Sequence, residues 1–251
     1  MRQRYSRQIV FDGIGEKGQE KLLRSRAAII GLGATGTVAA NNLCRAGVGF
    51  IRIIDRDCVE LINLHRQMLY DEQDASVPTQ KATAAFKRLA KINSEITLDP
   101  VVADVNAANI ETLIGDVDLV LDCSDNIELR YLVNEACDKL RKPWIYAGVL
   151  ASEGLTMNII PGETACFRCL FPEAPHPGSY STISTAGVLN SVTAVIASIE
   201  SAEALKILLC SPRVRKTLFR IDVWNNSSDY IDVGKNPDCP VCGRHKYETL
   251  I

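Results

Sequence analysis

Short apolar runs alternate with longer amphipathic stretches along the first two-thirds of the chain. The short runs predict buried strands, and the longer stretches, in which apolar side chains recur every three to four residues, predict helices. Strands are expected within residues 27–36, 50–55, 96–104, 117–125, 142–149 and 154–161, and helices within 37–47, 78–93, 106–114 and 127–140. Gly47 suits a helix C-terminus, Pro78 a helix start and Asn106 an N-cap. This alternation indicates a mostly parallel sheet that is covered on both faces.

The pattern changes after Pro161. Residues 171–185 are rich in Pro, Ser and Thr, which is typical of a mobile loop, and a long apolar helix is expected over 186–209. Residues 217–224 and 229–233 predict a terminal hairpin. We therefore predict an α/β fold: a Rossmann-like, doubly wound, mostly parallel sheet that is extended by C-terminal antiparallel strands.

Composition narrows the class of protein. With 251 residues, 47% of them hydrophobic, the chain can bury a substantial core. No segment reaches the roughly 18 uninterrupted apolar residues of a membrane span, and the N-terminus is too charged for a signal peptide. A formal net charge of −2 argues against broad electrostatic capture of nucleic acid. We expect a soluble cytoplasmic protein that binds neither nucleic acid nor membranes.

The sequence GLGATG at 31–36 follows a predicted strand and precedes a predicted helix. In this pattern Gly31 makes the tight turn, Gly33 lets the backbone approach a phosphate, and Gly36 permits close helix packing. Asp55 ends the next strand, where a carboxylate can bind ribose hydroxyls. These residues predict an adenosine nucleotide, and by themselves they permit NAD as well as ATP.

Further polar groups follow in the same region. They are Asp57, Asn63, Arg66, Gln67 and Lys81, and then Asp125 and Asn126 at the end of the fourth predicted strand. The pyrophosphate of NAD is satisfied by the glycine loop and the helix N-terminus, whereas a triphosphate carries additional charge that Arg66 and Lys81 can bind. For either residue alone, an ordinary surface cation is the favoured interpretation. Asp125 supplies the carboxylate that a Mg²⁺-bound triphosphate requires. We therefore favour ATP with Mg²⁺.

Nine cysteines are present, and four of them form two C-x-x-C pairs. The pairs are Cys166 with Cys169 and Cys239 with Cys242. Disulfides are not expected in a cytosolic protein. Four thiolates at this spacing are typical of a closed Zn²⁺ site that is structural and not catalytic, because no ligand position stays open. We expect zinc to fasten the C-terminal tail to the sheet extension. We expect the remaining five cysteines to be small buried apolar residues: Cys44, Cys58, Cys123, Cys137 and Cys210.

Seven motifs carry a resemblance to a known family. They are RYSRQI at 4–9, GLGATG at 31–36, the run 55–67, LDCSDN at 121–126, CFRCL at 166–170, TAGV at 185–188 and CPVCG at 239–243. In this order they resemble the ubiquitin-activating-like adenylyltransferases of the ThiF, MoeB and HesA type. The similarity is greatest to the bacterial enzymes that adenylate the sulfur carriers of thiamine and molybdopterin synthesis. It spans nearly the whole chain.

The resemblance implies an enzyme that uses ATP and Mg²⁺ to attach AMP to a carboxylate, with release of pyrophosphate. It implies that Asp55 holds the ribose and that Asp125 governs the metal and the reacting centre. Asn63, Arg66 and Lys81 would contact the phosphates. Arg7 would reach into the site of a neighbouring subunit, so a homodimer is implied. The implied organisation is a single domain over 1–251, with a helical arm (1–26), a nucleotide-binding core (27–160), and a zinc knuckle with the sheet extension (161–251).

One departure concerns the loop that crosses the active site in this family. Sulfur-transferring members carry a cysteine four residues before the glycine of AGV, and here that position is Ile183. In addition, Asn190 and Ser191 stand where the family usually has Gly-Pro, and Lys81 lies two residues further from Arg66 than usual. These changes indicate either the loss of a dispensable thiol or a change of acceptor.

The substrate therefore stays open at this point. The favoured substrate is the C-terminus of a small ubiquitin-like sulfur-carrier protein. The alternative is a peptide or small-molecule carboxylate, adenylated without a covalent enzyme intermediate. Alternatives of other classes are an NAD-dependent oxidoreductase and a non-catalytic binding module.

Overall fold

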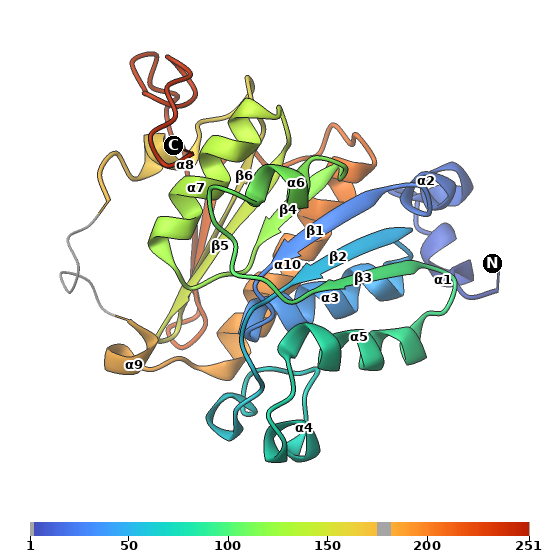
Figure 1. The fold of residues 1–251 in the computed structure, drawn as a ribbon. Helices are drawn as coiled ribbons and strands as arrows, with labels where there is room; N and C mark the ends of the chain where they lie inside the picture. The colour runs from blue at the N-terminus through green and yellow to red at the C-terminus, as the bar shows by residue number, and fades with distance from the viewer. Residues whose placement is uncertain (1–2, 175–181, 251) are drawn as a thin grey trace.

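The computed structural model describes residues 3–174 and 182–250. At its centre is an eight-stranded sheet in the order β3-β2-β1-β4-β5-β6-β7-β8 (Figure 1). The parallel strands are β1 (Arg26–Ile30), β2 (Phe50–Ile54), β3 (Thr97–Val101), β4 (Leu119–Asp122) and β5 (Trp144–Leu150). The antiparallel strands are β6 (Glu153–Ile159), β7 (Leu218–Asp222) and β8 (Ser227–Ile231). The predicted fold class is confirmed.

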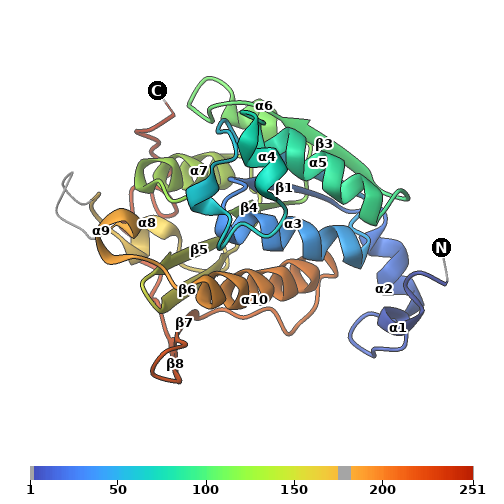
Figure 2. The ribbon, with the colours of Figure 1, turned by 90° about the horizontal axis from the view of Figure 1, so that it is seen from below.

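Helices cover both faces of the sheet (Figure 2). One face carries α3 (Ala34–Ala46), α5 (Lys81–Ile92) and α10 (Asn190–Leu208), and the other carries α6 (Ile110–Ile114) and α7 (Ile127–Lys139). In β1, Ala27 and Ile29 belong to the core on the first face, whereas Ala28 and Ile30 belong to the core on the second. Successive side chains of a strand point to opposite faces. Since both faces are buried, the strand is apolar at nearly every position.

Two short helices, α1 (Ser6–Ile9) and α2 (Gly15–Leu22), precede the sheet. They pack at the C-terminal end of α3, where the Gln8 side chain donates to the Ala46 carbonyl at 2.8 Å. Gly47 ends α3 in the left-handed conformation, as predicted, with φ of 80°. The N-terminal arm therefore lies at the amino edge of the parallel strands (Figure 1).

Some predicted boundaries were wrong. The helix expected from Pro78 begins at Lys81, because the preceding residues pair with the segment after β2: Val59 N–H donates to the Thr79 carbonyl at 2.8 Å. The helix expected from Asn106 begins at Ile110, since the Asn106 side chain forms a turn with the Ala108 amide. The third strand ends at Val101, earlier than predicted.

Four short helical segments were not expected, and two of them, η1 (Leu61–Asn63) and α8 (Phe167–Leu170), belong to the sites described below. α4 (Glu72–Ser76) is held by a reciprocal capping box between Asp71 and Asp74. Within the predicted loop 171–185, residues 183–186 form α9 (Ile183–Ala186), and the long helix then begins at Asn190. Residues 175–181 of that loop lie outside the described residues. None of the helices in the described ranges has the length and apolarity needed to cross a membrane.

Candidate active site and metal centre

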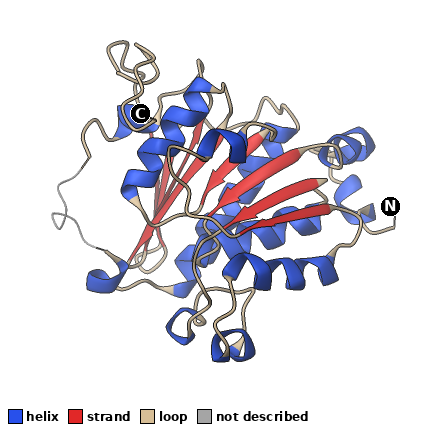
Figure 3. Ribbon diagram, viewed as in Figure 1, coloured by secondary structure: helices blue, strands red, loops and turns tan. Residues whose placement is uncertain are grey.

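The loops that follow β1, β2 and β4 meet at the carboxyl edge of the sheet (drawn tan in Figure 3). They begin with Gly31, Asp55 and Cys123 respectively. Ligands of open α/β sheets bind at this edge, next to the position where the strand order reverses. Here the order reverses at β1, which pairs with both β2 and β4. The predicted nucleotide-binding residues therefore gather around this reversal.

The glycine loop is shaped by close contacts between its own backbone and the β4 loop. Gly31 has a φ of +90°, and a Cβ there would lie 2.8 Å from the Cys123 carbonyl oxygen. A Cβ on Gly36 would collide with the Gly31 carbonyl. Only glycine allows both approaches. The predicted tight turn and close helix packing are thus visible in the backbone.

Gly33 faces open space. A Cβ at this position would meet only the Gln67 side-chain nitrogen, at 3.9 Å. Gln67 is buried, and its Oε1 has no hydrogen-bond partner among the described residues. A buried acceptor without a donor is costly. An open backbone position beside an unpartnered acceptor fits a ligand that carries hydrogen-bond donors and approaches the loop closely.

Asp55 lies directly beneath the glycine loop. Its carboxylate accepts from the Leu32 amide at 2.6 Å and from the Asp57 amide at 2.8 Å. Burial raises the pKa of Asp55, against these two amides and the nearby Lys81, which lower it. Each carboxylate oxygen still has a second acceptor position, so Asp55 can hold the loop and bind a ligand hydroxyl together.

Lys81 opens α5 and is buried. Its ammonium group lies 3.1 Å from the Asp57 carboxylate, and its amide donates to the Asp57 carbonyl at 2.9 Å. Asp57 also contacts Arg56 at 3.6 Å. The short helix η1 (Leu61–Asn63) leads to the second cation. There the Arg66 guanidinium donates to the Asn63 side-chain oxygen at 2.8 Å. Lys81 and Arg66 are therefore held near the glycine loop, Lys81 by Asp57 and Arg66 by Asn63.

Asp125 is exposed at the turn between β4 and α7, with no hydrogen bond or ion pair to another described residue. Next to it, Asn126 caps α7, because its side-chain oxygen accepts from the Leu129 amide at 3.0 Å. Its NH₂ group stays available to a ligand. The predicted carboxylate is therefore free for a cation at the same edge as the glycine loop.

A buried ion pair, which the sequence analysis did not identify, holds this turn. Asp122 is fully buried and accepts from Arg130 Nε at 3.0 Å and from the Ser124 hydroxyl at 2.6 Å. Arg130 also donates to the carbonyls of Ser124 (2.6 Å) and Ala147 (3.1 Å). The signal was an aspartate at the end of an otherwise apolar strand, LVLD. A charge there needs a buried partner.

A second buried carboxyl, on α10, was also missed. Glu200 is fully buried, and its oxygens lie 3.6 and 3.9 Å from the Cys123 sulfur. Burial, reinforced by the Asp122 charge, raises the pKa of Glu200 well above its usual range. Glu200 therefore holds its proton more tightly than an ordinary glutamate, next to the β4 loop that packs against the glycine turn.

Arg7 does not join the other predicted residues in its own chain. It is exposed in the last turn of α1, which packs at the C-terminal end of α3, whereas the glycine loop lies at the N-terminal end. The two ends of this 13-residue helix are roughly 20 Å apart.

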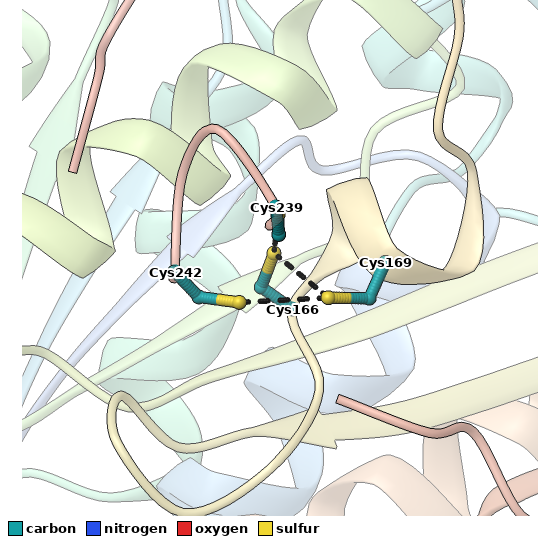
Figure 4. Close-up of side chains that lie close together, drawn as sticks. All are labelled: Cys166, Cys169, Cys239 and Cys242. Carbon is teal, nitrogen blue, oxygen red and sulfur yellow. Dashed lines mark hydrogen bonds between the residues drawn. The ribbon is translucent and has the colours of Figure 1, made fainter. Parts of the chain in front are cut away.

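The two cysteine pairs come together (Figure 4). The sulfurs of Cys166, Cys169, Cys239 and Cys242 all lie within 4.8 Å of one another, and three of their separations are 3.9, 3.6 and 3.5 Å. Four sulfurs about 2.3 Å from one Zn²⁺ would be about 3.8 Å apart in a tetrahedron. The hydrogen bond from Cys166 lowers the pKa of the Cys169 thiol to about 4. This geometry fits the predicted zinc site.

The C-terminal tail after this cluster is attached to α7, and not mainly to the sheet extension as predicted. The Asp138 carboxylate contacts the His245 ring at 2.8 Å and accepts from the Tyr247 hydroxyl at 3.0 Å. The Glu135 carboxylate accepts from the amide and the hydroxyl of Thr249, both at 2.7 Å. The cysteine cluster joins this tail to α8 (Phe167–Leu170).

Ile183, which the family resemblance predicts to stand in place of the cysteine, opens α9 and is half-buried. The segment after α9 is tied to the end of β5, since the Ala151 amide donates to the Gly187 carbonyl at 3.0 Å and the Leu189 amide to the Ala151 carbonyl at 2.8 Å. β5 runs parallel to β4, so Ile183 lies on the carboxyl side of the sheet.

Comparisons with known proteins agree with this arrangement. The model of the ThiF family matches residues 5–241. The sulfur carrier protein ThiS adenylyltransferase of Bacillus subtilis is 41% identical, over 98% of this chain and 73% of the relative. The SAMP-activating enzyme E1 of Haloferax volcanii is 36% identical, over 98% of this chain and 91% of the relative.

A solved structure is similar over the same extent. The structure of E. coli MccB with ATP has a TM-score of 0.83 and 25% identity, covering 96% of this chain and 74% of that chain. MccB has also been solved with MccA. These relatives confirm the family that the motifs predicted, and they favour adenylation over the NAD-dependent alternative. This chain therefore belongs to the ThiF family of adenylyltransferases.

Proposed function

We propose that this enzyme uses ATP and Mg²⁺ to adenylate the C-terminal carboxylate of a small ubiquitin-like sulfur-carrier protein. The observation that carries the proposal is the open backbone at Gly33, where a Cβ would meet only the Gln67 side-chain nitrogen, with Arg66, Lys81 and Asp125 around the same strand ends. The names of two relatives, which specify ThiS and SAMP, support a carrier protein as substrate.

The proposed roles follow from the contacts. Asp55 binds ribose hydroxyls through the acceptor positions that its two amide donors leave free. Gly31, Gly33 and Gly36 shape the phosphate loop, and the amide side chains of Gln67 and Asn126 offer further hydrogen bonds. Lys81, beside Asp57, and Arg66, beside Asn63, contact phosphate oxygens with the N–H donors that these contacts leave free. Asn63 and Asp57 then orient these cations from behind.

Mg²⁺, when bound, would neutralise phosphate charge, and Asp125 is the free carboxylate that would hold it. Attack by the substrate carboxylate at the α-phosphate places extra negative charge on its oxygens. Arg66 and Lys81 stabilise that charge more in the transition state than in the ground state. Pyrophosphate leaves, and the substrate retains AMP as a mixed anhydride.

The proposed assembly is a homodimer in which Arg7 completes the site of the partner subunit. Two groups of exposed apolar side chains support this assembly. Val10 and Phe11, beside Arg7, are 76% and 62% exposed, while Leu61 and Ile62, close in sequence to Arg66, are 69% and 74% exposed. Burying one group against the other would bring Arg7 to Arg66 of the partner. The proposed location is the cytoplasm.

The acyl-adenylate is proposed to react with an outside nucleophile. The relevant position on α9 is Ile183, which has no nucleophilic atom, and an acyl-adenylate is already electrophilic with AMP as its leaving group. A peptide carboxylate stays the second candidate substrate. The observation that favours it is the similarity to MccB, which has been solved with the peptide MccA.

The test is ATP–pyrophosphate exchange, with a carrier protein that ends in Gly-Gly, with short peptides and with no carboxylate. We expect exchange with the carrier, and exchange with peptides alone would select the second candidate. Asp125→Ala should reduce exchange at least about 100-fold, because the metal-bound triphosphate loses its carboxylate. Asp232→Ala, an exposed aspartate after β8, is the control and should leave exchange unchanged. Exchange by Asp125→Ala within threefold of wild type would remove Asp125 from the mechanism.

A further inference from the structure

Tyr70 is a buried tyrosine that lies behind the glycine loop and that no motif identifies. Its hydroxyl group is 2.9 Å from the Leu32 carbonyl and 3.3 Å from the Lys81 carbonyl. A phenol has one proton to donate, so the Tyr70 hydroxyl donates mainly to the Leu32 carbonyl, which is the closer acceptor. Burial raises the pKa of Tyr70 well above its usual range, which keeps that proton in place.

These bonds fix the orientation of the two peptide groups that flank Leu32. Its N–H donates to Asp55 at 2.6 Å, and its C=O accepts from Tyr70 at 2.9 Å. No cis peptide bond occurs in the described residues. In a trans peptide the C=O and the following N–H point in opposite directions. Because the Leu32 carbonyl points toward Tyr70, the Gly33 N–H points away from Tyr70.

The Gly33 side of the loop is where a ligand fits. The amides of Gly33, Ala34 and Thr35 donate to no carbonyl or side chain within the described residues, as expected at the start of a helix. A Cβ at Gly33 would meet only Gln67. If the Leu32–Gly33 peptide turned over, a carbonyl oxygen would replace the Gly33 N–H on this side and would repel a phosphate.

We propose that Tyr70 is a positioning residue: its bond to the Leu32 carbonyl keeps the Gly33 amide turned toward the phosphates of ATP. This inference rests on the proposed function, since it requires ATP at the glycine loop. Tyr70 also contacts the carbonyl of Lys81, so it links the loop to the residue that opens α5.

The matched control is Tyr131. It is also buried, and its hydroxyl donates to the Phe171 carbonyl at 3.0 Å, on the opposite face of the sheet. Tyr70→Phe and Tyr131→Phe therefore remove the same group from the same kind of bond. Both variants should lower the melting temperature by a few degrees, because each removes the hydrogen bond that a tyrosine hydroxyl donates to a backbone carbonyl.

The two variants should differ in nucleotide binding. By titration calorimetry with Mg²⁺, Tyr70→Phe should weaken ATP binding about tenfold and adenosine binding less than twofold, because adenosine has no phosphates. In pyrophosphate exchange, KM for ATP should rise about tenfold while kcat stays within twofold. Tyr131→Phe should keep all these values within twofold of wild type.

Other outcomes contradict the inference. Unchanged ATP affinity in Tyr70→Phe would limit Tyr70 to a structural role, and an equal loss for ATP and adenosine would indicate a general collapse of the site. Absence of ATP binding by the wild-type protein would instead overturn the proposed function, and the inference with it. Melting curves of each variant confirm that the measured species is folded.

Discussion

At the scale of single residues, α10 carries two buried glutamates whose pKa values shift in opposite directions. Glu200 faces the Cys123 sulfur, and burial raises its pKa well above the usual range. For Glu203 burial also raises the pKa, but hydrogen bonds from Lys206, the Arg215 amide and Asn158 outweigh it and lower the pKa overall. Both side chains are nearly inaccessible to solvent, so their different partners determine the sign.

Glu200→Gln should therefore stabilise the fold increasingly as the pH rises. A raised folded-state pKa favours folding below the unfolded pKa, and this advantage is lost above it, by about 1.4 kcal/mol per pH unit until the folded pKa is reached. A neutral glutamine does not carry this cost. The free energy of unfolding from urea titrations between pH 5 and pH 8 measures the difference between the two proteins. A constant difference across that range would show that Glu200 does not titrate as we infer.

Glu203→Gln on the same helix is the control with the opposite sign. Its lowered pKa contributes stability above the unfolded pKa, and this contribution is lost as the pH falls. The variant should lose about 1.5–3 kcal/mol at pH 7, because charge-assisted hydrogen bonds are removed, and the loss should shrink toward pH 3.

The sequence predicted part of the site because parallel strands place their carboxyl ends at one edge. Gly31, Asp55 and Asp125 each follow a strand, so their proximity follows from the fold class. Tyr70 and Glu200 could not be predicted in this way. Their roles depend on contacts to Leu32 and Cys123, across segments whose relative placement the pattern does not determine.

At the scale of elements, the strands and the longer helices were predicted, whereas the one-turn helices α4 and α9 were not. In α7 and α10 many residues are buried and contribute to the apolar pattern, whereas α4 and α9 are one-turn helices held by local capping boxes. Hydrogen bonds from the Ala108 amide to the Asn106 side chain and from the Val59 amide to the Thr79 carbonyl shifted two predicted starts. Such bonds depend on single polar atoms, and the spacing of apolar residues gives no information about them.

The cysteine cluster is the element whose removal should have the widest local effect. One Zn²⁺ per chain is expected, and chelation should release the tail that Asp138 and Glu135 hold on α7. Hydrogen exchange should then increase over residues 236–250 and in α8, and should change little in β1 and β2. Zinc content is measured by elemental analysis of protein prepared without chelator.

The control for this experiment is Cys210→Ser, which changes a cysteine outside the cluster that is exposed and not buried as predicted. It should retain one zinc, whereas Cys239→Ser should lose it. Metal-free protein with a fully protected tail would contradict the assignment.

At the scale of the whole molecule, Arg7 and the nucleotide loop lie at opposite ends of α3. Contacts between subunits leave no periodic pattern in the sequence of one chain, so only the family resemblance predicted the homodimer. The mixture of Arg7→Ala and Asp125→Ala proteins is the decisive experiment. Each variant alone should be inactive, and the mixture should regain up to about a quarter of wild-type exchange, because half of the chains enter mixed dimers with one intact site each.

The same mixture has a clear negative outcome. If labelled subunits exchange between dimers and no activity returns, Arg7 does not act across the interface. A Lys17→Ala chain, altered on the exposed side of α2, should be active alone and should not change the result.

The contact between Gly31 and Cys123 has a consequence for how the protein folds. β1 lies beside β4 in the sheet, although β2 and β3 both come between them in the chain. The carbonyl that supports the nucleotide loop therefore arrives from a distant part of the sequence. Closing such a long loop is slow compared with forming local helices. During synthesis on the ribosome, a chain that ends before β4 lacks the Cys123 carbonyl that packs against the nucleotide loop. ATP therefore stabilises only molecules in which the central strands have already paired.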